Sequence, residues 1–235
     1  MKHGTLYAKE VKKVFNRLVR ERGRAKKIDL TDPVEQLLLG ILSRETTETG
    51  ATSALKRLRE SAVDVNELRV SSPRELMGPL GQDFPQALEK ARDINGMLNE
   101  VFNRQHDLDL TFLRNKSRRE ARQYLEKLPG VDRHTVASVM LLSIGGHAVP
   151  VDGHMLAFLR QAELVDPEAD EKEIEAFLER NVSATDAYTF YVRFRRYAAS
   201  VRPRKEAASA SAGTGQTTAK TKKAKRVTKP KKRRQ

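Results

Sequence analysis

The 235-residue chain is 38% hydrophobic, with 45 Lys and Arg residues against 31 Asp and Glu residues and a formal net charge of +14. Twelve basic residues but one acidic residue, Glu206, lie between Arg204 and Gln235, so this segment carries +11 and residues 1–203 carry +3. The chain has no cysteine, which excludes disulfides, thiolate zinc sites and iron–sulfur clusters, and we expect no cofactor and no metal site.

The apolar runs of the sequence are short. None approaches the roughly 18 residues that a membrane-spanning helix needs, and the first residues, MKHGTLYAKEV, lack the apolar core of a signal peptide. We therefore expect a soluble, intracellular protein without a membrane partner.

Helical patterns follow one another from the N-terminus. Apolar residues between positions 6 and 19 fall mainly at helical spacing with Lys and Arg opposite, which predicts a packed helix with a solvated basic face. Asp32 and the proline after it predict the N-cap of a buried helix through LLLGILS. Ser72 and Ser117, each followed three residues later by glutamate, predict two more N-caps.

The remaining elements are also predicted to be helices. They cover about Phe84 to Phe102, Asp152 to Ala162, Glu171 to Arg180 and Thr185 to Ser200. The VPV segment, 149–151, is too short to decide between a strand and a buried connection. The sequence therefore predicts an all-α fold of about ten short helices, followed by a disordered basic tail, 203–235, which has almost nothing to bury.

The segment LEKLPGVDRHTVASV, 125–139, joins two predicted helices by a tight turn. Pro129 and Gly130 end one helical pattern, and the next begins near Asp132. The first backbone N–H groups of a helix attract an anion such as phosphate, and Gly130 would let a nucleic-acid backbone approach without a Cβ in the way. An ordinary turn between two helices has the same features, so this segment alone leaves both interpretations open.

The segment AVPVDGHMLAF, 148–158, places Asp152 and His154 at the start of a helix. An aspartate there is usually an N-cap, whose removal costs about 1 kcal/mol. Taken alone, Asp152 is therefore predicted to be structural. We expect His154 to be a hydrogen-bonded packing residue, and His147 receives no role.

Together, the residues LPGVDRHTVASVMLLSIGGHAVPVDGHM resemble the helix–hairpin–helix and the following aspartate of the endonuclease III-like DNA glycosylases. The resemblance runs from about Asp32 to Tyr197 and includes DPVEQLLLGILSRETTETGA, which is similar to the early helix and the DNA-entering loop of that superfamily. It implies two helical domains with a DNA cleft between them. The first, 32–146, is a six-helix barrel with the helix–hairpin–helix at about 117–144; the second combines 1–31 with 147–202.

The resemblance also implies site residues. The DNA-binding residues would be Leu128, Pro129, Gly130, Val131 and Arg133 in the hairpin and Glu45 in the loop, where relatives often carry a glutamine. The catalytic residues would be Asp152, as the acid, and His134, which stands at the position of the family's lysine. We expect the mildly basic body to bind double-stranded DNA through the hairpin amides and Arg118, Arg119 and Arg133.

Two departures from the family pattern limit the chemistry. An imidazole has no primary amine, so we do not expect His134 to support strand cleavage through a Schiff base; it could orient a water, touch a phosphate or have no role. Asp132 replaces a glycine beside the expected phosphate site, where two like charges about 4 Å apart repel by roughly 4 kcal/mol at an effective dielectric of 20. Either Asp132 turns inward as a helix cap, or phosphate binding is weakened.

Two functions follow from these residues. The first is a monofunctional base-excision-repair glycosylase that hydrolyses the N-glycosidic bond of a damaged base, which the retained Asp152 favours. The second is a catalytically silent helix–hairpin–helix DNA-binding protein, which His134, Asp132 and Glu45 favour. We prefer the enzyme, and we expect it to act as a monomer in the cytoplasm or associated with DNA in a nucleoid or nucleus.

Overall fold

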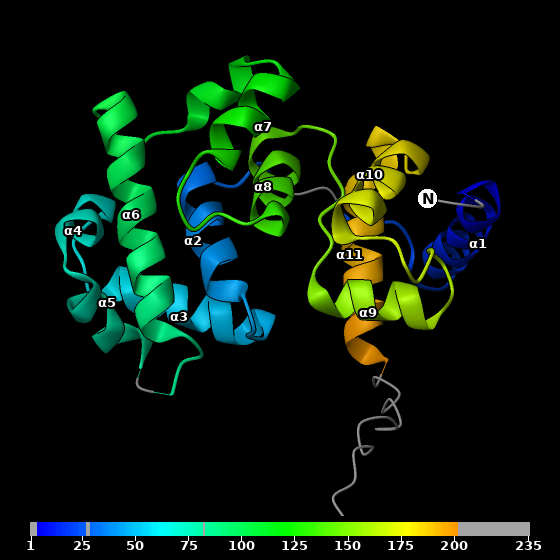
Figure 1. The fold of residues 1–235 in the computed structure, drawn as a ribbon, viewed down its shortest axis with the longest axis horizontal. Coiled ribbons are helices and arrows are strands. Elements are labelled where there is room, and N and C mark those ends of the chain that lie inside the picture. The colour runs from blue at the N-terminus through cyan, green and yellow to red at the C-terminus, as the bar shows by residue number, and fades with distance from the viewer. Residues whose placement is uncertain (1–3, 27–28, 82, 202–235) are drawn as a thin grey trace, which may run out of the picture. The chain divides into compact units, whose positions relative to one another are not determined.

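The computed structural model describes residues 4–26, 29–81 and 83–201, and the predicted tail, 203–235, lies outside them. Every regular element in the described ranges is a helix, which confirms the all-α prediction (Figure 1). The α-helices are α1 (Gly4–Arg22), α2 (Pro33–Ser43), α3 (Glu48–Glu60), α4 (Val65–Val70), α5 (Pro73–Leu80), α6 (Ala87–Gln105), α7 (Arg118–Glu126), α8 (Arg133–Val139), α9 (Gly153–Gln161), α10 (Glu171–Asn181) and α11 (Ala184–Ser200). A 3-10 helix, η1, covers Thr111–Asn115, and a π-helix, η2 (Met140–Ile144), continues α8.

The helix starts follow the predicted capping residues. The Asp32 Oδ1 atom accepts a hydrogen bond of 2.9 Å from the Glu35 backbone N–H at the start of α2. Ser72 and Ser117 each form a capping box with the glutamate three residues later. These short-range bonds satisfy backbone donors that a helix leaves free at its first turn. The VPV segment is not a strand; it is a connection in which Val149 is fully buried.

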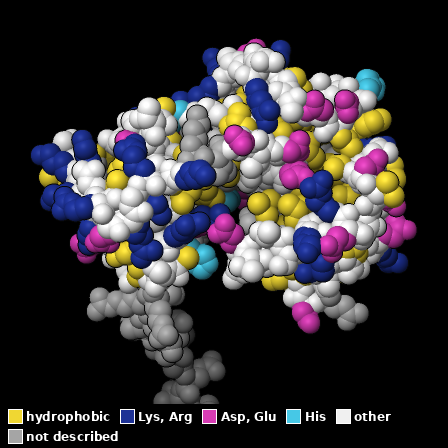
Figure 2. All heavy atoms as spheres, turned by 180° about the vertical axis from the view of Figure 1, so that it is seen from behind, with side chains coloured by type: hydrophobic (Ala, Val, Ile, Leu, Met, Phe, Trp, Pro, Cys, Tyr) yellow, Lys and Arg dark blue, Asp and Glu magenta, His cyan; other side chains and the backbone are white. Residues whose placement is uncertain are grey.

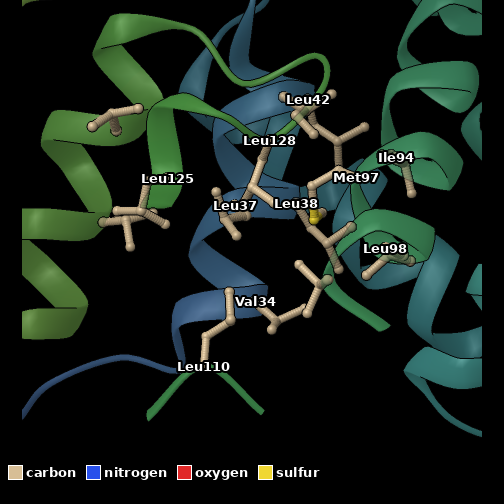
Figure 3. Packing of buried hydrophobic residues seen from close by; sticks show 14 of the residues in the cluster. Val34, Leu37, Leu38, Leu42, Ile94, Met97, Leu98, Leu110, Leu125 and Leu128 are labelled. Carbon is tan, nitrogen blue, oxygen red and sulfur yellow. The ribbon is translucent and has the colours of Figure 1, made fainter. Parts of the chain in front are cut away.

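The first hydrophobic core is formed by α2 to α8 with the residues that follow, from Val34 to Ala148. Leu37 and Leu38 of α2, Met97 of α6 and Leu128 lie close together in its centre (Figure 3). Leu128 lies in the turn between α7 and α8 and is only 3% exposed. The core therefore fixes the turn through one of its own side chains, since burying a leucine contributes about 1.5–3 kcal/mol.

The second core is formed by α1 and α9 to α11, which Figure 1 shows grouped together. Its residues run from Val11 to Leu18 and from Val149 to Ala198, so the chain leaves this group after α1 and returns between Ala148 and Val149. The Phe190 and Phe194 rings are stacked with centroids 4.0 Å apart. Residues far apart in the sequence thus form one apolar group around α11.

Candidate active site and nucleic-acid interface

The turn between α7 and α8 is a tight hairpin. The Leu128 N–H donates to the Leu125 carbonyl at 3.1 Å, and Gly130 follows with a φ of +69°, a conformation that favours glycine. The Asp132 Oδ1 atom then accepts a hydrogen bond of 2.7 Å from the Thr135 N–H. Asp132 is therefore the N-cap of α8, the first of the two alternatives that the sequence left open.

Gly130 lets the hairpin pack closely against α6. A Cβ at Gly130 would lie 2.4 Å from the Cβ of Asp93 on α6, closer than carbon atoms can approach. Pro129, in contrast, is exposed. The hairpin therefore packs against α6 at Gly130, which holds the exposed tip in a fixed position.

The hairpin arginines are paired with acidic residues of α10. Arg133 Nη2 lies 2.7 Å from Glu175 Oε2, and Arg118 Nη2 lies 3.0 Å from Glu179 Oε2. Burial raises the pKa of Glu175, and the neighbouring Arg133 opposes this rise. Arg119 is exposed. Arg118 and Arg133 thus each have a carboxylate partner within the protein, and their expected contact with DNA stays a prediction.

Asp152 uses its two carboxylate oxygens differently. Oδ1 accepts a hydrogen bond of 2.8 Å from the Met155 N–H and caps α9. Oδ2 accepts a hydrogen bond of 3.1 Å from Nε of Arg195 on α11. The capping role that the residues alone favoured is therefore present, and the second oxygen adds a charged contact that a simple cap does not need.

Arg195 connects several groups around Asp152. Its Nη1 donates to the Tyr191 hydroxyl at 2.9 Å and lies 3.6 Å from Oε1 of Glu48, in the first turn of α3. Burial raises the pKa of Tyr191 to about 12, although the nearby Arg195 opposes the shift. Tyr191 therefore stays a neutral phenol at physiological pH. Arg195 joins the second core to α3, which belongs to the first.

His134 is the second residue of α8 and directly follows the hairpin. Its Nε2 atom is buried and has no hydrogen-bond partner among the described residues. Burial lowers the pKa of His134, while the nearby carboxylates of Asp132 and Asp152 act in the opposite direction. The imidazole is therefore neutral at pH 7. An unsatisfied buried nitrogen is unusual and can mark a place where a substrate or water binds.

A pocket of about 390 Å³ lies beside His134. Its lining residues are Val131, Asp132, Arg133, His134, Val151, Glu171 and Glu175. They come from the hairpin, from the residue before Asp152 and from α10, so the pocket opens where the two cores meet. Its size is within the range of small-molecule sites.

Glu45 lies in the loop between α2 and α3 and is exposed, with a left-handed φ of +48°. Such a conformation is uncommon for a residue other than glycine. The loop is held from below by Lys90 of α6, whose Nζ donates to the Leu42 carbonyl at 3.2 Å and to the Arg44 carbonyl at 2.6 Å. Arg44 also forms an ion pair with Asp93. One face of α6 therefore supports both the Glu45 loop and the hairpin.

Neither a protein-family model nor a curated protein sequence matches the chain. Solved structures do. A trapped endonuclease III–DNA covalent intermediate is 20% identical, with a TM-score of 0.65, over 81% of this chain and 86% of that one. A thermostable thymine-DNA glycosylase is 18% identical, with a TM-score of 0.63, over 86% of this chain and 90% of that one.

A third match is H. pylori 3-methyladenine DNA glycosylase (MagIII) bound to 1,N6-ethenoadenine. It is 13% identical, with a TM-score of 0.60, over 83% of this chain and 97% of that one. The chain has the endonuclease III fold. This confirms the likeness in fold that the motifs implied. Sequence identities of 13% to 20% show the fold but not the reaction, which depends on the side chains of the site.

Within the endonuclease III fold, this chain places Asp132 and Asp152 close enough for both carboxylates to act electrostatically on the His134 imidazole. The sequence alone did not predict two residues that shape the site. These are Arg195, which binds Asp152 from 43 positions away, and Lys90, which supports the Glu45 loop. For Arg195, the available signal was weak: a cluster of three arginines on α11, in the segment YVRFRRYAAS.

His154 and His147, which the sequence analysis also considered, have different surroundings. His154 is exposed at the start of α9, so the prediction of a hydrogen-bonded packing residue was wrong. It failed because the residues of α9 that face the core are Met155, Leu156, Phe158 and Leu159, and His154 precedes them on the exposed side. His147 Nε2, which received no role, forms a hydrogen bond of 2.9 Å with the Val182 carbonyl.

Among residues 4–26, 29–81 and 83–201, no group of three or more His, Cys, Asp or Glu side chains could hold a metal ion. No helix in these ranges is long and apolar enough to cross a membrane.

Proposed function

We propose that the protein is a DNA glycosylase of base-excision repair that hydrolyses the N-glycosidic bond of a damaged base in double-stranded DNA, without a Schiff-base step. The observation that carries this proposal is the arrangement of Asp152: one oxygen caps α9, and the other is oriented by Arg195. The matched solved structures are described as an endonuclease III–DNA covalent intermediate and two DNA glycosylases, which supports a reaction of this class.

The reaction requires a base to leave the stack, at a cost of a few kcal/mol. As the bond between C1′ and the base breaks, the sugar gains positive charge, which the Asp152 carboxylate can stabilise. The base leaves with the electron pair of the broken bond and takes up a proton from solvent, while water forms the new bond to C1′ and gives its proton to Asp152. A neutral His134 can hold that water or a phosphate oxygen through its free Nε2 but cannot form an imine.

DNA would be held by the hairpin and by the Glu45 loop. In this proposal, the backbone amide at Gly130 faces a phosphate, Pro129, Val131 and Arg133 lie beside it, and Leu128 anchors the turn. Glu45 would enter the space left by the extruded base. We further propose that the two cores are two domains, 32–146 and 1–31 with 147–202, that the DNA lies between them, and that the protein acts as a monomer.

A catalytically silent DNA-binding protein is the second candidate. The observation that favours it is the same ion pair, because a carboxylate held by Arg195 is partly neutralised in the protein without DNA. Under this alternative, the cap and the ion pair are purely structural.

Base release from a panel of damaged duplexes, read as strand nicking after heat and alkali, separates the two functions. We expect release by the natural protein and a loss of at least about 100-fold in Asp152→Asn, since acid–base groups typically contribute 10²–10⁴. The asparagine can still cap α9, so the melting temperature and DNA affinity should change little.

Asp170→Asn is the matched control, because Asp170 caps α10 with the same geometry and lies outside the proposed site. It should lose no activity. If Asp152→Asn releases bases normally, or loses activity only in proportion to its melting temperature, the catalytic role is wrong. If the natural protein releases no base but binds duplexes, the silent alternative is correct.

A further inference from the structure

Helix α1 has two chemically distinct faces. Val11, Phe15 and Leu18 lie on one face and are at most 9% exposed in the second core. The opposite face carries exposed basic residues, which are Lys9, Lys12, Lys13, Arg17 and Arg20. Their spacing of three and four residues places them along one stripe. With a rise of 1.5 Å per residue, the stripe is about 16 Å long.

This helix accounts for the net positive charge of the body. Residues 4–22 contain six Lys or Arg and two Glu, a net charge of +4, whereas residues 1–203 together carry +3. The rest of the body therefore carries a net charge of −1. In the hairpin, Arg118 and Arg133 are paired with Glu179 and Glu175, so these two charges are partly offset within the protein.

Most charges of the stripe are available to a partner. Lys9, Lys12 and Arg20 form no ion pair within the described residues. Lys13 lies 2.6 Å from Glu10, but both side chains are largely exposed, and such pairs are worth less than about 1 kcal/mol. Figure 2 shows Lys and Arg side chains gathered over the part of the molecule formed by α1 and α9 to α11.

We propose that this stripe of α1 binds the phosphate backbone of duplex nucleic acid, as a contact surface additional to the hairpin. A stripe of about 16 Å covers roughly five base pairs at 3.4 Å per pair along each strand. A membrane surface is the other polyanion to consider. A helix that binds lipid inserts its apolar face, and here that face is buried in the protein core, so the stripe offers charge alone.

The surface goes beyond the proposed glycosylase function, because it requires DNA but neither Asp152 nor base release. It would extend the DNA contact without reading sequence, since phosphate contacts position a duplex but do not specify it.

The test compares two full-length variants that each lose three positive charges. One is Lys9→Gln, Lys12→Gln and Arg20→Gln on α1; the control is Lys56→Gln, Arg74→Gln and Arg180→Gln, which are exposed on other helices. The affinity for an undamaged duplex is measured by fluorescence anisotropy over a range of salt concentrations. The logarithm of affinity falls with log salt by about 0.9 for each phosphate neutralised.

We expect the slope of the α1 variant to be less steep by about 2 to 3 than that of the natural protein, and the slope of the control variant to change by less than about half a unit. Equal slopes for both variants would overturn the proposal. So would an α1 variant that keeps its duplex affinity but loses binding to phosphatidylserine vesicles. Failure of the glycosylase function is distinguishable, because it would appear as absent base release with the slope difference intact.

Discussion

Nε of Arg195 on α11 lies 3.1 Å from Oδ2 of Asp152 at the start of α9. This bond leaves Oδ1 free to cap the helix, so one carboxylate has both a structural and a charged contact. Arg195 is itself held by the Tyr191 hydroxyl and Glu48. The orientation of the proposed catalytic acid therefore depends on α11 and α3 as well as on its own helix.

Arg195→Met should reduce base release through Asp152. Losing a charge-assisted hydrogen bond costs about 1.5–3 kcal/mol, which corresponds to a fall of roughly ten- to hundredfold in the single-turnover rate. DNA affinity should change much less, and Arg195→Lys should restore part of the rate. The neighbouring exposed Arg196→Met is the control. An effect on affinity alone, or no rescue by lysine, would argue against positioning.

Borohydride should trap no covalent complex between the natural protein and abasic DNA, because His134 offers no primary amine. His134→Lys should form such a complex if the geometry resembles that of the family's lysine. The adduct is detected by gel mobility and located by mass spectrometry of the peptide. An adduct of the natural protein at a lysine elsewhere would show that His134 does not stand at the nucleophile position.

Gly130→Ala should destabilise the hairpin more than its backbone angle alone explains. Gly130 and Gly23 have φ values of +69° and +70°, but an added Cβ meets Asp93 only at Gly130 and nothing within 4 Å at Gly23. Strain from the left-handed angle costs about 1 kcal/mol or more at either position. Thermal unfolding should therefore show a larger loss for Gly130→Ala than for Gly23→Ala, together with weaker duplex binding. Equal losses would mean that the contact with α6 is unimportant.

Lys90 should make stability rise with pH in the alkaline range. Burial, with a smaller contribution from Arg44, lowers its pKa from 10.5 to about 8. Between these values the unfolded chain holds a proton that folded Lys90 has released, so the free energy of unfolding increases with pH. Denaturant unfolding between pH 8 and 10.5 should show this rise, and Lys90→Met should remove it, whereas Met at the exposed Lys56 should not. The same slope in Lys90→Met would place the titration elsewhere.

The sequence by itself determined the local features of this protein. Asp32, Ser72 and Ser117 cap helices as predicted, because an N-cap bonds to a backbone N–H only three residues away. The apolar periodicity determined the all-α fold in the same way, since it is read within a few turns of one helix. The tight turn at Pro129 and Gly130 is also a local feature that the sequence alone predicts.

Only the tertiary structure decided which side chains meet. From the sequence, Arg133 is expected to bind DNA, and in the structure it forms an ion pair with Glu175. Asp152 is expected to cap a helix, and in the structure it also binds Arg195. Lys90 is buried beneath the loop that carries Glu45. Each of these contacts joins residues 42 to 46 positions apart. The local sequence cannot encode such a pair, because the partner and the burial of a charge depend on how separate helices pack.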